Sequence, residues 1–406
     1  MTAAIFNLRF VIGAAMLAIG LCTNAWAQRV DATVAIGEGN RIWSKTLQEE
    51  RRLLVYLPPG YRHSDERYPV LYLLDAEAQF HHSTGIVNFL GTDNGRIPEM
   101  IVIGVTNTNR LRDLTPPTKD AEQRKDHPDA GGADAFLTFL ADELRPWVDA
   151  NYRTQPYRVL TGHSLGGLFA VHALLRRPDA FQAYIAVSPS LWWDKRATVA
   201  DAKANIGRVP TGRHFLRMTW GDNENVIRDS TTELVEWLKA NPPAGVQWSS
   251  HYYAGDDHGS TPHRSLYDGL EELYTDWRPR FEIDDQPQNL DLAAIEAHYA
   301  KLSQRYGYTI KPSADAIGQV ARGLVKNKQN TEALELLRRN VREYPWLASV
   351  HAQLGDTLAE LNRPEEARRA YEQALQLQLE GESPYQDPLQ AFREKMTELA
   401  APKKRN

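Results

Sequence analysis

The sequence predicts a mostly parallel α/β domain followed by an all-α repeat region. Short apolar runs alternate with amphipathic stretches from about residue 31 to 280. This alternation is typical of strands buried in a sheet that helices cover on both faces. After about residue 285 no strand pattern is found. Apolar and small residues recur there with a 34-residue period, which is typical of stacked helix pairs.

Seven apolar runs are the predicted strands of the sheet. In chain order they cover residues 53–57, 68–74, 101–106, 157–161, 183–187, 214–220 and 246–253. Between these runs, apolar side chains recur on one face of a helix. Two such sets are Leu137, Leu140, Leu144 and Val148, and Leu234, Trp237 and Leu238.

The first 27 residues are predicted to be an export signal. Arg9 precedes an apolar run, residues 10–22, that is too short to span a bilayer comfortably. Ala25-Trp26-Ala27 then carries small residues at the two positions that a signal peptidase reads. We expect cleavage after Ala27, a periplasmic or secreted mature chain, and no stable membrane anchor. The alternative is an uncleaved anchor.

Composition excludes several classes of protein. Hydrophobic residues make up 42% and charged residues 24% of the chain, which are ordinary values for a folded protein. The formal net charge is −5 and the basic runs are short, so no nucleic-acid partner is expected. Cys22 is the only cysteine and lies in the predicted leader, so the mature chain is expected to be stabilised by a large core.

The periodic C-terminal region contains two copies of one pattern. Val320, Leu324, Ala333 and Leu337 recur as Leu354, Leu358, Ala367 and Tyr371. This pattern resembles the tetratricopeptide repeat, a helix pair in which small residues allow close packing. Flanking helices over 290–306 and 386–400 are expected to complete the stack or to seal it against the first domain, and a plain helical bundle is the alternative. The resemblance implies a surface for a protein partner or for self-association.

A nucleophile motif follows the fourth predicted strand. Residues Gly162-His163-Ser164-Leu165-Gly166 lie between that strand and a predicted helix over 167–177. A G-x-S-x-G element in a strand–turn–helix context exposes the serine hydroxyl at the carboxyl end of a sheet. Ser164 is therefore the predicted nucleophile.

A serine needs a base, and the base needs an orienting acid. In this arrangement the chain order is serine, acid, histidine. His258 follows the last predicted strand and is the expected base. Asp222 and Glu224 both lie in the loop after the preceding strand, and residue chemistry alone does not separate them.

The motifs together resemble an esterase family of the esterase D and enterochelin-esterase kind, in the α/β-hydrolase superfamily. They lie at residues 55–61, 70–75, 162–167, 188–194 and 257–259. Relatives place the acid three residues after a glycine, which here is Gly221, so the resemblance implies a Ser164–Glu224–His258 triad. It also implies an oxyanion hole formed by the backbone N–H groups of Leu165 and Glu77.

The chain departs from the family pattern beside the second oxyanion donor. Relatives usually carry Asp-Gly where this chain has Asp75-Ala76. A left-handed backbone at Ala76 would be strained, because alanine has a Cβ atom and glycine does not.

Four further residues are candidates for contact with substrate. Arg110 and Arg112 lie in a run that relatives share, and either residue suits a carboxylate or polar acid group. An internal salt bridge to Asp113 is the alternative. Trp192 and Trp193 suit an aromatic pocket or, equally, the core. His81-His82 lacks the partners of a metal motif, so no metal and no cofactor are expected.

These features predict an exported serine esterase with three segments. They are a signal peptide at 1–27, an α/β-hydrolase domain at 28–283 and a helical domain at 284–406. The substrate is expected to be a small-molecule or polysaccharide ester. An acyltransferase that uses the same triad, and a non-catalytic hydrolase-fold binding protein, are the alternatives.

Overall fold

The structure is a computed structural model that describes residues 35–212, 214–279, 292–380 and 387–400. The predicted leader, residues 1–27, and its cleavage site lie outside these ranges. Within them, no helix combines the length and the apolar character needed to cross a membrane.

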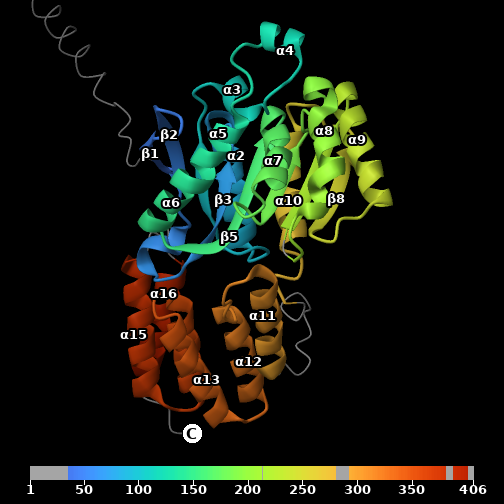
Figure 1. The fold of residues 1–406 in the computed structure, drawn as a ribbon. Helices are drawn as coiled ribbons and strands as arrows, with labels where there is room; N and C mark the ends of the chain where they lie inside the picture. The colour runs from blue at the N-terminus through green and yellow to red at the C-terminus, as the bar shows by residue number, and fades with distance from the viewer. Residues whose placement is uncertain (1–34, 213, 280–291, 381–386, 401–406) are drawn as a thin grey trace, which may run out of the picture. The chain divides into compact units, whose positions relative to one another are not determined.

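An eight-stranded sheet forms the centre of the α/β part (Figure 1). Its strands are β1 (Glu38–Ser44), β2 (Glu49–Tyr56), β3 (Tyr68–Leu73), β4 (Ile101–Val105), β5 (Thr154–His163), β6 (Ala183–Val187), β7 (His214–Gly221) and β8 (Val246–Tyr253). The order is β1-β2-β4-β3-β5-β6-β7-β8. Strands β1, β2 and β4 pair antiparallel, and β4-β3-β5-β6-β7-β8 pair parallel. The predicted mostly parallel sheet is confirmed.

Helices cover both faces of this sheet, because its central strands are apolar on both sides. Every residue of β3, β4 and β6 is buried. The helical elements are η1 (Pro59–His63), α2 (Ala76–Val87), η2 (Asn88–Asp93), α3 (Arg110–Leu114), α4 (Ala121–Asp126), α5 (Ala133–Thr138), η3 (Phe139–Leu144), α6 (Arg145–Asn151), α7 (Leu165–Arg176), α8 (Trp193–Asn205), η4 (Ile206–Arg208), α9 (Asn225–Ala240) and α10 (Thr261–Leu273). One buried cluster contains Leu140 and Leu168, and a second contains Ile86 and Leu270.

In the described residues after 291 the regular elements are all helices, as predicted. These helices are α11 (Leu292–Tyr306), α12 (Ala314–Lys326), α13 (Asn330–Glu343), α14 (Ala348–Glu360), α15 (Pro364–Glu380) and α16 (Asp387–Ala400). A Cβ atom added to Gly355 would lie 2.8 Å from the ring of Tyr371, so the small residue allows α14 and α15 to approach closely. Ala333 and Ala367, which occupy equivalent repeat positions, are fully buried.

Candidate active site

Ser164 lies on the tight turn that joins β5 to α7. Its backbone has φ 61° and ψ −114°, a strained conformation for a residue with a side chain. Neighbouring glycines are required by space: a Cβ atom at Gly162 would lie 2.5 Å from the backbone of Gly166. At Gly167 it would lie 2.8 Å from the Val187 carbonyl oxygen. The Ser164 N–H donates to the same Val187 carbonyl at 2.9 Å, which ties the turn to β6.

His258 and Glu224 form a hydrogen-bonded pair from two different loops. The imidazole Nδ1 lies 2.5 Å from Oε1 of Glu224. The carboxylate is 2% exposed, whereas the imidazole is 44% exposed and therefore open to a substrate. Glu224 follows β7 and His258 follows β8, so both reach the sheet edge at which β5 delivers Ser164.

The carboxylate of Glu224 remains charged although it is buried. Burial acts to raise its pKa, but hydrogen bonds from His258, the Gly221 N–H and the Ser188 hydroxyl together lower that pKa below its ordinary value. The Gly221 bond is 2.6 Å and the Ser188 bond is 3.0 Å, both to Oε2. An ionised acid at this position fixes Nδ1 as the protonated nitrogen of His258 and leaves Nε2 as the acceptor.

Asp222, the other candidate acid, has different partners. Its carboxylate accepts a hydrogen bond from the Tyr252 hydroxyl and another from the Gly255 N–H at 2.8 Å. These bonds lower the pKa of Asp222 and tie the loop after β7 to the end of β8 and to the loop that follows it. The structure therefore pairs Glu224, rather than Asp222, with the imidazole.

Two side chains at or just after the carboxyl ends of β5 and β6 contact this site and were not singled out from the sequence. The Ser164 hydroxyl lies 3.2 Å from the hydroxyl of Ser190, which is 2% exposed. The ring of His163 lies 4.3 Å from that of His258, centroid to centroid. Burial, followed by the neighbouring His258, lowers the pKa of His163 to about 4, so its ring is neutral at pH 7. Ser190 lies inside a motif shared with relatives, which was the available signal.

The predicted second oxyanion donor lies at the start of α2. Asp75 caps this helix in the left-handed conformation, with φ 53° and ψ 40°, and its carbonyl accepts from the N–H groups of Ala78 and Gln79. The amides of Ala76 and Glu77 precede these and have no acceptor within the helix. Because the left-handed residue is Asp75, Ala76 is helical and the strain considered there does not arise. Its methyl group instead fills space beside Gly104.

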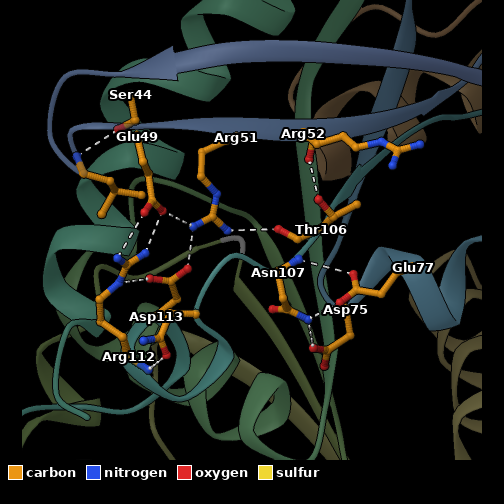
Figure 2. Close-up of polar contacts among 12 residues, drawn as sticks. Ser44, Glu49, Arg51, Arg52, Asp75, Glu77, Thr106, Asn107, Arg112 and Asp113 are labelled. Atoms are coloured by element: carbon orange, nitrogen blue, oxygen red, sulfur yellow. Dashed lines mark hydrogen bonds and ion pairs between the residues drawn. The ribbon is translucent and has the colours of Figure 1, made fainter. Parts of the chain in front are cut away.

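The two candidate arginines make internal ion pairs. Arg110 binds both carboxylate oxygens of Asp75, whereas Arg112 binds Glu49 and Asp113. Figure 2 shows the second of these groups, in which Arg51 also reaches Asp113. The salt bridge to Asp113, the alternative considered for this loop, is therefore made by Arg112.

The tryptophans differ in exposure. Trp193 is 3% exposed and its ring lies 5.5 Å from that of His127, whereas Trp192 is 40% exposed. Of the two, Trp192 has the surface to meet a ligand. His82 bonds to Gln79 at 2.6 Å, and no group of three metal-ligating side chains occurs in the described part of the chain.

Comparison with known families gives two matches. The family described as Putative esterase matches residues 44–282, and the tetratricopeptide repeat matches residues 348–379. The second match confirms the predicted repeat over its second copy.

Individual relatives carry more specific names. The chain is 32% identical to the ferri-bacillibactin esterase BesA of Bacillus subtilis, over 47% of this chain and 73% of that protein. It is 31% identical to a siderophore enterobactin esterase of Emericella nidulans, over 51% of this chain and 69% of that protein. Among solved structures, an IroE-like serine hydrolase from Shewanella oneidensis is 31% identical with a TM-score of 0.64, covering 76% of this chain and 99% of that one.

Proposed function

Because the chain belongs to this esterase family, we propose that it is an exported serine esterase that hydrolyses carboxylic esters through an acyl-enzyme on Ser164. The observation that carries the proposal is the Glu224–His258 pair, which lies at the same sheet edge as the strained Ser164 turn. The predicted leader at residues 1–27 supports export.

In the first half of the reaction, the Ser164 hydroxyl turns from Ser190 toward the imidazole and attacks the ester carbonyl. His258 Nε2 takes the hydroxyl proton as the Oγ–C bond forms. The negative charge of the tetrahedral intermediate develops on the former carbonyl oxygen. The N–H groups of Leu165 and Glu77, at the starts of α7 and α2, are the proposed donors to it.

Collapse of this intermediate breaks the ester C–O bond, and the alcohol leaves with the proton that His258 carries. Water then gives a proton to the same nitrogen and attacks the acyl-enzyme, and the Ser164 Oγ–C bond breaks to release the acid. Glu224 remains ionised throughout and stabilises the imidazolium that forms in each half. The proton is returned to Ser164 at the end of the cycle.

For the substrate, we propose the ester linkages of a siderophore. The support is that two fungal relatives are named as siderophore esterases and that BesA is named as a ferri-bacillibactin esterase. The exposed ring of Trp192 lies two residues from Ser190 and offers a surface for an aromatic acyl group.

The test combines a covalent probe with a substrate panel. An organophosphonate should label Ser164 in the wild-type chain and leave Ser164→Ala unlabelled, and that variant should lose turnover of p-nitrophenyl butyrate while keeping its circular dichroism spectrum. A wild-type chain that is not labelled would exclude a serine mechanism. Catecholate and hydroxamate siderophore esters should be cleaved faster than feruloyl and simple acyl esters, and the opposite order would exclude the proposed substrate.

A further inference from the structure

Arg110 bonds to both sides of the proposed oxyanion hole. Its Nε donates to Oδ1 of Asp75 at 2.6 Å, and its Nη2 donates to Oδ2 at 2.9 Å. The same Nη2 donates to the His163 carbonyl oxygen at 3.1 Å. Asp75 is the residue before the first amides of α2, and His163 is the residue before Ser164 and Leu165. One planar guanidinium therefore connects the segments that supply the two proposed donors.

The conformation of Asp75 needs such a restraint. A residue with a side chain in a sparsely populated backbone region costs about 1–3 kcal/mol and persists only where its surroundings hold it. A bidentate arginine–carboxylate pair fixes the carboxylate in both distance and plane. Hydrogen bonding to Asp75 is also the largest cause of the raised pKa of Arg110, so the guanidinium is charged at neutral pH.

Asn107 also holds this turn, by hydrogen bonds to the side chains of Asp75 and Glu77 (Figure 2). Its Nδ2 donates to Asp75 at 2.7 Å and to the Glu77 carboxylate at 2.6 Å, and its backbone N–H donates to the other Glu77 oxygen at 3.2 Å. Hydrogen bonds therefore fix the first and last residues of the turn at 75–77, which carries the proposed donor.

The segment that carries Arg110 is itself held in place by a buried ion pair. Asp113 is 1% exposed and receives Arg51 at 2.5 Å and Arg112 Nε at 2.7 Å. Arg51 also donates to the Thr106 carbonyl at 3.0 Å, next to Asn107 (Figure 2). The buried ion pair anchors residues 106–114 to strand β2, so the backbone that carries Arg110 is fixed to the sheet.

We infer that Arg110 is a positioning residue that sets the geometry of the oxyanion hole, rather than a ligand of the substrate. The inference rests on the proposed function of Ser164 as a nucleophile. It places the effect of Arg110 on the transition state, where negative charge develops, and therefore on kcat. A residue that binds substrate would instead change KM for anionic substrates.

The experiment compares Arg110→Gln with Arg112→Gln on p-nitrophenyl butyrate, which is neutral, and on p-nitrophenyl hemisuccinate, which is anionic. Arg112 is a matched control because it lies on the same short helix and makes ion pairs, but to Glu49 and Asp113. Arg110→Gln should lower kcat about 10- to 100-fold on both esters with KM changed less than about threefold, below the loss expected for removing one donor outright. Arg110→Lys should recover part of the loss, since a lysine keeps the charge without the bidentate geometry.

Two outcomes would overturn the inference. A rise in KM confined to the anionic ester would make Arg110 a substrate ligand. An equal fall in kcat for Arg112→Gln would show that loosening of the loop, and not the bond to Asp75, is responsible. Urea unfolding of each variant at 25 °C separates these effects from loss of the fold.

The rate of Ser164 labelling by the organophosphonate distinguishes this inference from the proposed function. If the wild-type chain is not labelled, the proposed function fails. If the wild-type chain is labelled and Arg110→Gln is labelled at the same rate, the function stands and the inference fails. Slower labelling of Arg110→Gln supports both the proposed function and the inference, because the phosphonyl oxygen accepts from the same N–H groups as the oxyanion of an ester.

Discussion

Several residues with side chains adopt positive φ around the candidate active site, and three of them are held by hydrogen bonds. Asp75 has φ 53°, Ser164 has φ 61° and Ser188 has φ 42°. Each is held by its own hydrogen bonds, to Arg110, Val187 and Thr219 respectively. Such residues persist where the fold holds them and often lie at functional sites. The folded chain therefore holds these residues in strained conformations, at a cost in its free energy of unfolding, and this fixes the positions of a few atoms in the site.

The strain at Ser164 can be measured by removing its side chain in two ways. Ser164→Gly should unfold with a free energy about 1 kcal/mol higher than Ser164→Ala, because alanine keeps the Cβ atom that disfavours this backbone and glycine does not. Both variants should be inactive. Chemical denaturation at pH 7 measures the difference, and equal values would mean that the turn is not strained.

The two loop carboxylates should differ in their effect on rate. Glu224→Gln removes the charge that stabilises the His258 imidazolium, so kcat should fall about 100-fold or more. Asp222→Asn keeps an oxygen that can accept from Tyr252 or Gly255, and kcat should fall less than about tenfold. Steady-state rates on p-nitrophenyl butyrate check this ranking, and the reverse order would reassign the acid.

At the scale of elements, the sequence predicted seven of the eight strands and missed the edge strand β1. Seven apolar runs became β2 to β8, whereas β1 was not predicted. Its sequence, EGNRIWS, has little apolar character, because β1 lies at the sheet edge and most of its side chains are exposed. It is held by backbone pairing with β2, which leaves no apolar pattern to detect.

We predict opposite changes in stability when two helical glycines, Gly355 on α14 and Gly323 on α12, are replaced by alanine. Gly355→Ala should destabilise the chain by about 1 kcal/mol or more, because its Cβ would meet the ring of Tyr371, which is 2% exposed and bonded to Asp356. Gly323→Ala on α12 should stabilise it by up to about 1 kcal/mol, because nothing lies within 4 Å of the new Cβ. Thermal unfolding of both variants tests the pair, and a stabilising Gly355→Ala would contradict the close approach.

At the scale of the whole molecule, two partly buried histidines couple stability to pH. Burial, followed by neighbouring histidines, lowers the pKa of both His82 and His163 to about 4. The unfolded chain binds protons at these positions below about pH 6.5, and the folded chain does so only below about pH 4. Their contribution to stability is therefore complete above pH 6.5 and is lost as the pH falls toward 4.

Replacing one of these histidines should flatten that dependence. His163→Phe keeps a ring beside His258 and removes the titrating group, so the loss of unfolding free energy between pH 7 and pH 5 should shrink by on the order of 1 kcal/mol. His63→Gln, which removes an exposed histidine, is the control for the loss of an imidazole. Urea unfolding at the two pH values measures it, and an unchanged slope in His163→Phe would mean that His163 titrates normally in the folded chain.

Whether a site residue could be predicted from the sequence depends on whether its role follows from nearby residues or from partners far away in the chain. Ser164 and His258 could be singled out because they follow apolar strands in a fixed chain order. Glu224 needed the family spacing, since Asp222 has the same chemistry two residues away. Ser190, Asn107 and the role of Arg110 could not be assigned, because their partners lie 26 to 53 residues away in the chain. Only folding brings those partners into contact.

The Arg51–Asp113 pair has an evolutionary consequence. Removing Arg51 leaves Asp113 with Arg112 alone, and removing Asp113 leaves Arg51 with Glu49 alone, so either change takes one partner from a buried charge and destabilises the chain. Single substitutions at either position should therefore be selected against. Among descendants of a common ancestor, changes at these two positions should therefore be correlated.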